Sequence, residues 1–175
     1  MLKLLYLSYQ LNNAMISNLI LNYFLLIPTG LLLNIFLGLV IIGITVAIQA
    51  YGSSFWMRYV GKKIKNLTKL ELDKTSVKLL VSTASFLLLL NFSQAIVWGL
   101  LYYLLPNITE FETLEKAIYF SLVTFTSLGY GEITISSSNR ILAGFEAMNG
   151  ILLLGWSTTL MFSVMQFIWK NSLKK

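Results

Sequence analysis

Three long stretches without charged residues most constrain what this chain can fold into. They cover residues 4–57, 79–109 and 147–169. An α-helix needs roughly 20 mostly apolar residues to cross about 30 Å of hydrocarbon. Each stretch is long enough to do so, and the sequence therefore predicts an all-α integral membrane protein.

The composition excludes several other classes of protein. Only 11% of the residues are charged, whereas a soluble domain carries about 25%. The chain has no histidine and no cysteine, which removes the commonest general base and the thiolate metal ligands. We therefore expect neither an enzyme nor a bound cofactor. The net charge of +6 is concentrated between apolar stretches, which indicates membrane orientation and lipid contact, not nucleic-acid binding.

The lysines and arginines predict how the chain is oriented. Residues 58–76 form the only long polar segment and are expected to be a basic loop, and short basic loops stay in the cytoplasm. A first transmembrane helix is predicted over 31–57 and a second, outer helix over 77–105. The last helix, predicted over 140–169, is followed by lysines. It therefore returns the chain to the cytoplasm.

The N-terminal segment 1–30 allows two interpretations. It is apolar, but glutamine and asparagine side chains interrupt it, and they do not gather on one helical face. The segment is either an extra crossing helix or an interfacial one, and the sequence does not decide between them.

A shorter apolar stretch follows the outer helix and is too short to cross a membrane. We predict a half-crossing helix over 113–126, because Thr113 can cap its N-terminus and Glu115 lies in its first turn. It runs directly into glycine-rich chain at 127–131. Extended backbone is tolerated at membrane depth only where it is buried in protein or lines a water-filled path. The pattern is typical of a re-entrant loop.

Residues 117–132 resemble the pore helix and selectivity filter of potassium channels. The filter match is Ser127-Leu128-Gly129-Tyr130-Gly131, in which serine replaces the usual threonine and leucine the usual valine. In such filters, backbone carbonyls from four chains replace the water around a potassium ion. Glycine takes the backbone angles that this arrangement needs at little cost.

The resemblance continues into the last helix. Glu146, Asn149-Gly150 and the run Gly155-Trp156-Ser157-Thr158 are similar to the final helix of small bacterial ion-channel proteins of the pore-loop potassium-channel superfamily. That resemblance implies a homotetramer with a pore domain over 77–170. It also implies a location in the bacterial inner (plasma) membrane and potassium ions in the filter as the only bound groups. Monovalent cations would be the only soluble substrate.

The resemblance also implies roles for individual residues. Potassium would lie at Ser127, Leu128, Gly129 and Tyr130, and Glu132 would ring the outer mouth. The expected filter supports are Thr126, Tyr119, Phe120 and Glu146.

Three of the inner-helix roles have alternatives. Glu146 could instead reach the outer interface and pair with Arg140. Gly150 stands at the position of a gating hinge, but glycine could equally allow close helix packing. Leu154 and Thr158 would line the cavity below the filter, or else pack against a neighbouring helix.

Three functions remain open at this point. The first is a passive, leak-like potassium channel, because no span carries the regularly spaced arginines of a voltage sensor. The second is a non-selective monovalent cation channel, since Ser127 in place of threonine could loosen selectivity. The third is a non-conducting membrane subunit.

Overall fold

The computed structural model describes residues 29–66, 69–135 and 139–173. Within them the chain forms four helices and no strand: α2 (Thr29–Lys65), α3 (Lys69–Leu104), α4 (Leu114–Phe125) and α5 (Arg140–Leu173). The N-terminal segment, with its two interpretations, lies outside the described residues up to position 28.

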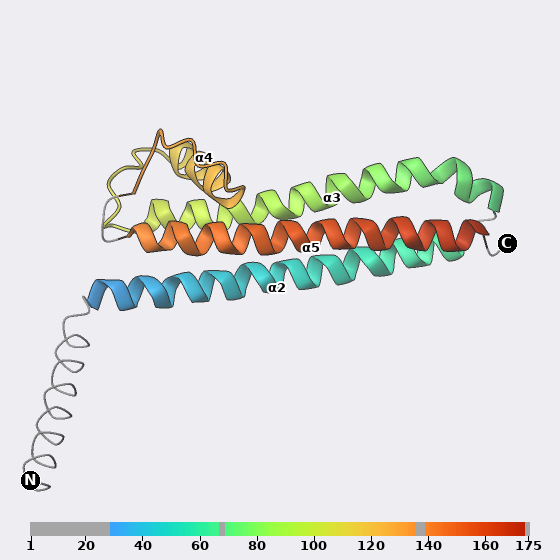
Figure 1. The fold of residues 1–175 in the computed structure, drawn as a ribbon, viewed down its shortest axis with the longest axis horizontal. Helices are drawn as coiled ribbons and strands as arrows, with labels where there is room; N and C mark the ends of the chain where they lie inside the picture. The colour runs from blue at the N-terminus through green and yellow to red at the C-terminus, as the bar shows by residue number, and fades with distance from the viewer. Residues whose placement is uncertain (1–28, 67–68, 136–138, 174–175) are drawn as a thin grey trace, which may run out of the picture.

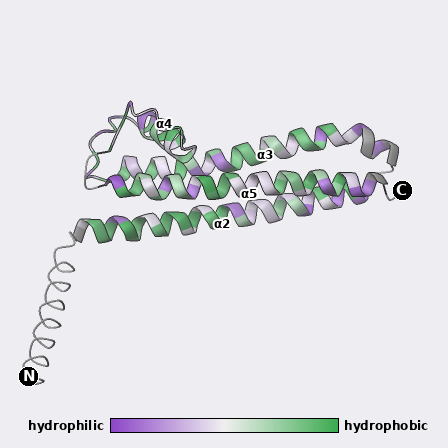
Figure 2. Cartoon of the chain, viewed as in Figure 1, coloured by the Kyte–Doolittle hydropathy of each residue, from purple (hydrophilic) through white to green (hydrophobic). Residues whose placement is uncertain are grey.

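The three long helices lie side by side (Figure 1), with α2 and α5 running in the same direction and α3 in the opposite one. The helical stretches Gly30–Lys65, Lys74–Leu104 and Arg140–Asn171 are long and apolar enough to cross a membrane. Figure 2 shows apolar residues along most of each of these helices. The prediction of an all-α protein with membrane-spanning helices is confirmed.

The basic segment 58–76 is not the loop that the sequence suggested. Helix α2 continues to Lys65 and α3 begins at Lys69, so the connection between them is short. Lysine, leucine and glutamate are good helix formers, and polarity here marks where the helices leave the apolar region, not where they end. The 37 residues of α2 extend over about 55 Å, well beyond the hydrocarbon thickness. The three lysines of its last turn lie at the negative end of the helix dipole.

Helix α4 packs against α3 and α5 near the ends of these helices that lie away from the lysines (Figure 1). Its observed bounds agree with the helix predicted over 113–126. Thr113 is the N-cap, and its hydroxyl accepts a hydrogen bond from the Lys116 amide at 3.3 Å. The C-cap is Thr126, whose amide donates to the Leu122 carbonyl at 3.1 Å. The apolar core around α4 includes the buried side chains of Trp98, Tyr102, Phe111 and Leu142.

Candidate functional site

The segment that follows α4 has an alternating backbone. The angle φ is 59° at Ser127, 54° at Gly129 and 80° at Gly131, and it is not positive at Leu128 or Tyr130 between them. Alternating handedness turns successive peptide planes the same way, which places the N–H groups on one side of the chain and the C=O groups on the other. The two glycines adopt these angles without steric cost. Ser127 is a non-glycine residue in the same region, which is uncommon.

The amides of this segment turn back to the end of α4. Ser127 donates to the Thr124 carbonyl at 2.9 Å, and Leu128 and Gly129 both donate to the Val123 carbonyl, at 2.9 and 3.3 Å. The last carbonyls of a helix have no partner within it, so these bonds satisfy α4 and fix the segment at once. Nothing in the described part of the chain donates to the carbonyls of residues 127–131. They form a row of free oxygen acceptors.

The row of carbonyls is open in a single chain. Leu128 is 59% exposed and Tyr130 is 64% exposed, although both are large and apolar or aromatic. Among the described residues, no group of three or more acidic, histidine or cysteine side chains could hold a metal ion. Oxygen groups that this segment itself offers include its backbone carbonyls and the Ser127 hydroxyl.

Tyr119 reaches the outer end of the segment. Its hydroxyl donates to the Glu132 carboxylate at 3.3 Å, which links α4 to the residue predicted at the mouth. Tyr119, Phe120 and Tyr130 all line one cavity of about 250 Å³ beside the segment. Two of the expected filter supports, Tyr119 and Phe120, therefore line the same cavity as Tyr130.

Phe120 also belongs to the interior of the single chain. Its ring lies edge-on to that of Tyr102, with 5.3 Å between the ring centroids, and it packs against Phe111 at 5.2 Å. Thr126 donates its hydroxyl to the Leu122 carbonyl at 2.7 Å. Both residues therefore hold α4 in place, one through its core face and the other through its last turn.

Glu146 is fully buried and joins three helices. Tyr102 of α3 donates its hydroxyl to the carboxyl oxygen Oε2 at 2.7 Å, and Ser121 of α4 donates to Oε1. The Ser121 hydroxyl also lies 2.6 Å from the Ala95 carbonyl of α3. These contacts are those of a brace between α5 and α4, and the alternative pairing with Arg140 does not form here. The sequence did not predict Tyr102 and Ser121 as partners of Glu146; Ser121 is one of two serine or threonine hydroxyls within α4.

Gly150 lies directly against the end of α4. A Cβ atom at this position would overlap the Phe125 carbonyl oxygen and lie 2.7 Å from the carbonyl carbon. The close approach requires glycine, which is the packing role that the sequence left open. Helix α5 continues unbroken through Gly150, and the hinge stays a prediction.

Leu154 and Thr158 lie on a side of α5 that adjoins α3. Both line a hollow of about 450 Å³ between α3 and α5, together with Asn91 and Ser157. Thr158 is exposed in the single chain and Leu154 is half-buried. Their role in lining a conduction cavity stays a prediction.

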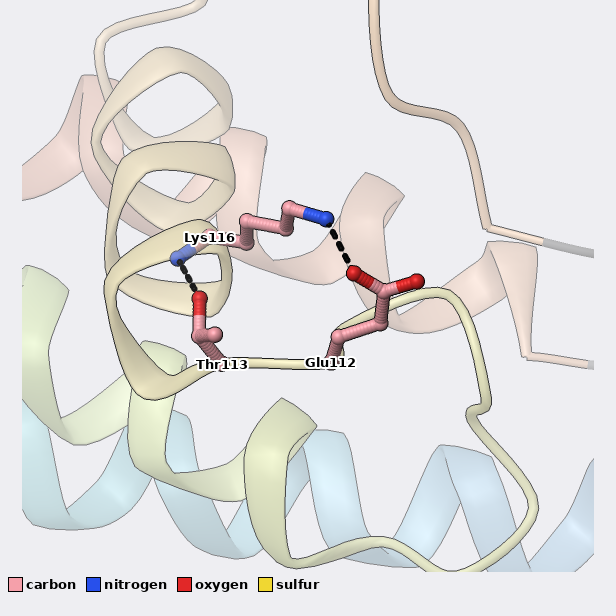
Figure 3. A network of polar contacts seen from close by, with 3 residues as sticks. All are labelled: Glu112, Thr113 and Lys116. Carbon is pink, nitrogen blue, oxygen red and sulfur yellow. Dashed lines mark hydrogen bonds and ion pairs between the residues drawn. The ribbon is translucent and has the colours of Figure 1, made fainter.

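An ion pair lies at the start of α4. Lys116 donates to the Glu112 carboxylate at 2.6 Å, one helical turn away (Figure 3). The hydrogen bond from Lys116, and then its positive charge, lower the pKa of Glu112. The pair fixes the approach of the chain to the Thr113 cap.

The comparison with known families agrees with this geometry. Residues 84–167 match the family model described as an ion channel. The match begins within α3, contains all of α4 and the segment 127–131, and ends within α5. Neither a curated protein nor a solved structure matches the chain.

Proposed function

We propose, from the match of residues 84–167 to an ion-channel family, that four copies of this chain form a potassium-selective channel. The chain is an integral membrane protein, and the family match indicates ion passage. Potassium selectivity, passive conduction and location in the plasma membrane are the parts that we add.

The observation that carries the proposal is the alternating backbone of residues 127–131. The positive φ angles at every second residue and the amide bonds to α4 leave one side of the segment to its carbonyl oxygens. A dehydrated potassium ion needs such oxygens to replace its hydration shell. Successive ion positions would lie along Ser127, Leu128, Gly129 and Tyr130.

A single chain supplies only one wall of this site. The described part of the chain has one such segment, and the side chains of Leu128 and Tyr130 in it are largely exposed. Closed rotational symmetry is the usual way in which identical chains complete a shared site. Four copies would surround an ion with carbonyls and would cover these exposed side chains. Four copies of Glu132 would then concentrate cations at the mouth.

The same proposal makes α4 a re-entrant pore helix. It is too short to cross the hydrocarbon, since its 12 residues span about 18 Å. It lies against α3 and α5 and is fixed at its middle by the bond from Ser121 to Glu146. The C-terminal end of α4, which is the negative end of its helix dipole, adjoins the segment that would form the filter, where it favours a cation.

Replacing Gly129 with alanine tests the assignment. Alanine at a φ of 54° costs roughly 1–2 kcal/mol per residue, and in a tetramer the strain would act on all four carbonyl rows together. We expect purified Gly129→Ala protein in liposomes to lose potassium flux while it still expresses and assembles. Gly144→Ala is the matched control, because nothing lies within 4 Å of the added methyl group.

Unchanged flux in Gly129→Ala would contradict the filter assignment. The same liposomes separate the alternatives. Equal sodium and potassium flux in the wild type would indicate a non-selective cation channel, and no flux at all would indicate a non-conducting subunit.

A further inference from the structure

Helix α2 lies outside the residues that match the ion-channel family, yet it packs along both α3 and α5. Its contacts with α5 include buried polar groups at two levels. Polar side chains are rare and costly inside a membrane, and they usually form hydrogen bonds between helices. The contacts therefore call for a functional account.

The first contact lies beside Gly150. Asn149 of α5 donates its amide to the Thr45 hydroxyl of α2 at 2.7 Å. Thr45 in turn lies 3.0 Å from the Ile41 carbonyl of its own helix, and both side chains are buried. Because Gly150 lies directly against the Phe125 backbone, the Asn149–Gly150 pair connects α2 to the end of α4.

The second contact lies about two turns further along α5. Gln49 of α2 donates to the Ser157 hydroxyl of α5 at 3.0 Å and accepts from Gln94 of α3 at 2.7 Å. Asn91 of α3 also donates to Ser157, at 3.0 Å. All four side chains are buried. One glutamine of α2 therefore ties all three long helices together.

We propose that Thr45 and Gln49 are positioning residues of the pore. They hold α5 at Asn149 and Ser157, on either side of Gly150 and Gly155, and so restrain α5 from bending between these two points. The inference rests on the proposed channel function. It assigns a role in the open–closed equilibrium to a helix that precedes the family segment.

The network also contains buried acceptors without a partner. Gln94 Oε1 and Asn149 Oδ1 accept no hydrogen bond within the described part of the chain. A buried amide oxygen without a partner is costly, and such a group calls for an explanation. If the network only stabilised helix packing, both acceptors would be expected to receive hydrogen bonds. If its hydrogen bonds change partners when α5 moves, the two acceptors need no donor in this conformation.

Three substitutions test the restraint in single-channel recordings. An average interhelical hydrogen bond in a membrane corresponds to about a three-fold change in an equilibrium. Gln49→Leu removes two such bonds, and we expect the ratio of open to closed time to rise roughly eight-fold. Thr45→Val should raise it about three-fold, while Thr45→Ser, which keeps the hydroxyl, should restore the wild-type ratio. Unitary conductance should not change.

A matched control removes a hydroxyl that bonds within its own helix. Ser93 donates to the Leu90 carbonyl of α3 at 2.7 Å, and Ser93→Ala should leave the ratio unchanged. In a double-mutant cycle, Ser157→Ala should change the ratio of open to closed time less in the Gln49→Leu background than in the wild type, because the two residues share a hydrogen bond. The inference would be overturned if Gln49→Leu lowered the ratio of open to closed time below that of the wild type, or left it equal to that of Ser93→Ala.

A disulfide reports the docking of α2 independently of conduction. The chain has no cysteine, and a Cβ at Gly38 would lie 3.4 Å from the Cβ of Phe145, close to the range of about 3.5–4.5 Å in disulfides. The pair Gly38→Cys and Phe145→Cys should cross-link α2 to α5 within one chain. The cross-link should also form in the Gln49→Leu background, which shows that this variant still folds.

The outcomes separate the two proposals. No cross-link in membranes would overturn the docking of α2, and with it the restraint. If the protein cross-links and conducts, but Gln49→Leu does not change its ratio of open to closed time, the restraint is overturned and the channel function is not. A wild type that passes no potassium would overturn the proposed function and this inference with it.

Discussion

Replacing Gly150 with alanine would add a methyl group where α5 meets the end of α4. That methyl group would overlap the carbonyl oxygen of Phe125 and lie 2.7 Å from the carbonyl carbon and 3.0 Å from Cα. All of these are backbone atoms, so no rotation of a side chain can relieve the contact. Either α5 or the last turn of α4 must move.

The size of the effect follows from two opposing contributions. An extra methyl group in a closely packed site costs about 1–3 kcal/mol. Alanine in place of glycine within a helix contributes about 1 kcal/mol in the other direction. We therefore expect a net loss of up to about 2 kcal/mol in the free energy of unfolding per chain. Because Phe125 immediately precedes the cap at Thr126 and the filter segment, the displacement should reduce potassium flux more than the stability loss alone implies.

Thermal unfolding of the purified protein and flux in liposomes measure the two effects. Gly144→Ala is the matched control, since nothing lies within 4 Å of a methyl group at that position. It should keep or raise the Tm, whereas Gly150→Ala should lower it and reduce flux. A Gly150→Ala protein with the Tm and flux of the control would refute the packing argument.

Two further predictions concern the contacts of α4. Glu146→Ala would leave the buried Tyr102 hydroxyl without its acceptor, at about 1–3 kcal/mol, while the Ser121 hydroxyl would keep the Ala95 carbonyl. Glu146→Gln keeps one acceptor oxygen, so the alanine variant should have the lower Tm, and equal Tm values would contradict the brace. Lys116→Met should raise the pKa of Glu112 toward its ordinary value, because Lys116 lowers it, as carboxyl NMR shifts would show. A lowered pKa means that the pair persists at neutral pH and is lost as pH falls through that pKa; an unchanged titration in Lys116→Met would reject the pairing.

The local features of the site could be predicted from the sequence because neighbouring residues determine them. Thr113 caps α4 as expected, and the helix ends at the predicted position before the glycine-rich segment. The requirement for glycine at positions 129 and 131 follows from the backbone angles that a row of carbonyls needs. Asn91 and Gln94 are polar residues within an apolar stretch of the sequence, and both donate hydrogen bonds to other helices.

The contacts between distant helices could not be predicted in this way. Helix α5 is apolar on all sides, so the sequence did not indicate which face meets α2 and which meets α3. The partners of Glu146 and the contact of Gly150 with Phe125 depend on how α5 is rotated about its own axis. The segment 58–76 was taken as a loop because its charge marks the edge of the apolar region. Charge does not prevent a helix from continuing beyond it.

Potassium selectivity is tested most directly by a single-channel recording of the purified wild-type protein with potassium on one side of the bilayer and sodium on the other. We expect discrete openings whose reversal potential lies close to that of a potassium electrode. Openings that reverse near zero millivolts would show that the carbonyl row does not discriminate between the two ions. A silent bilayer that contains correctly assembled protein would contradict conduction itself.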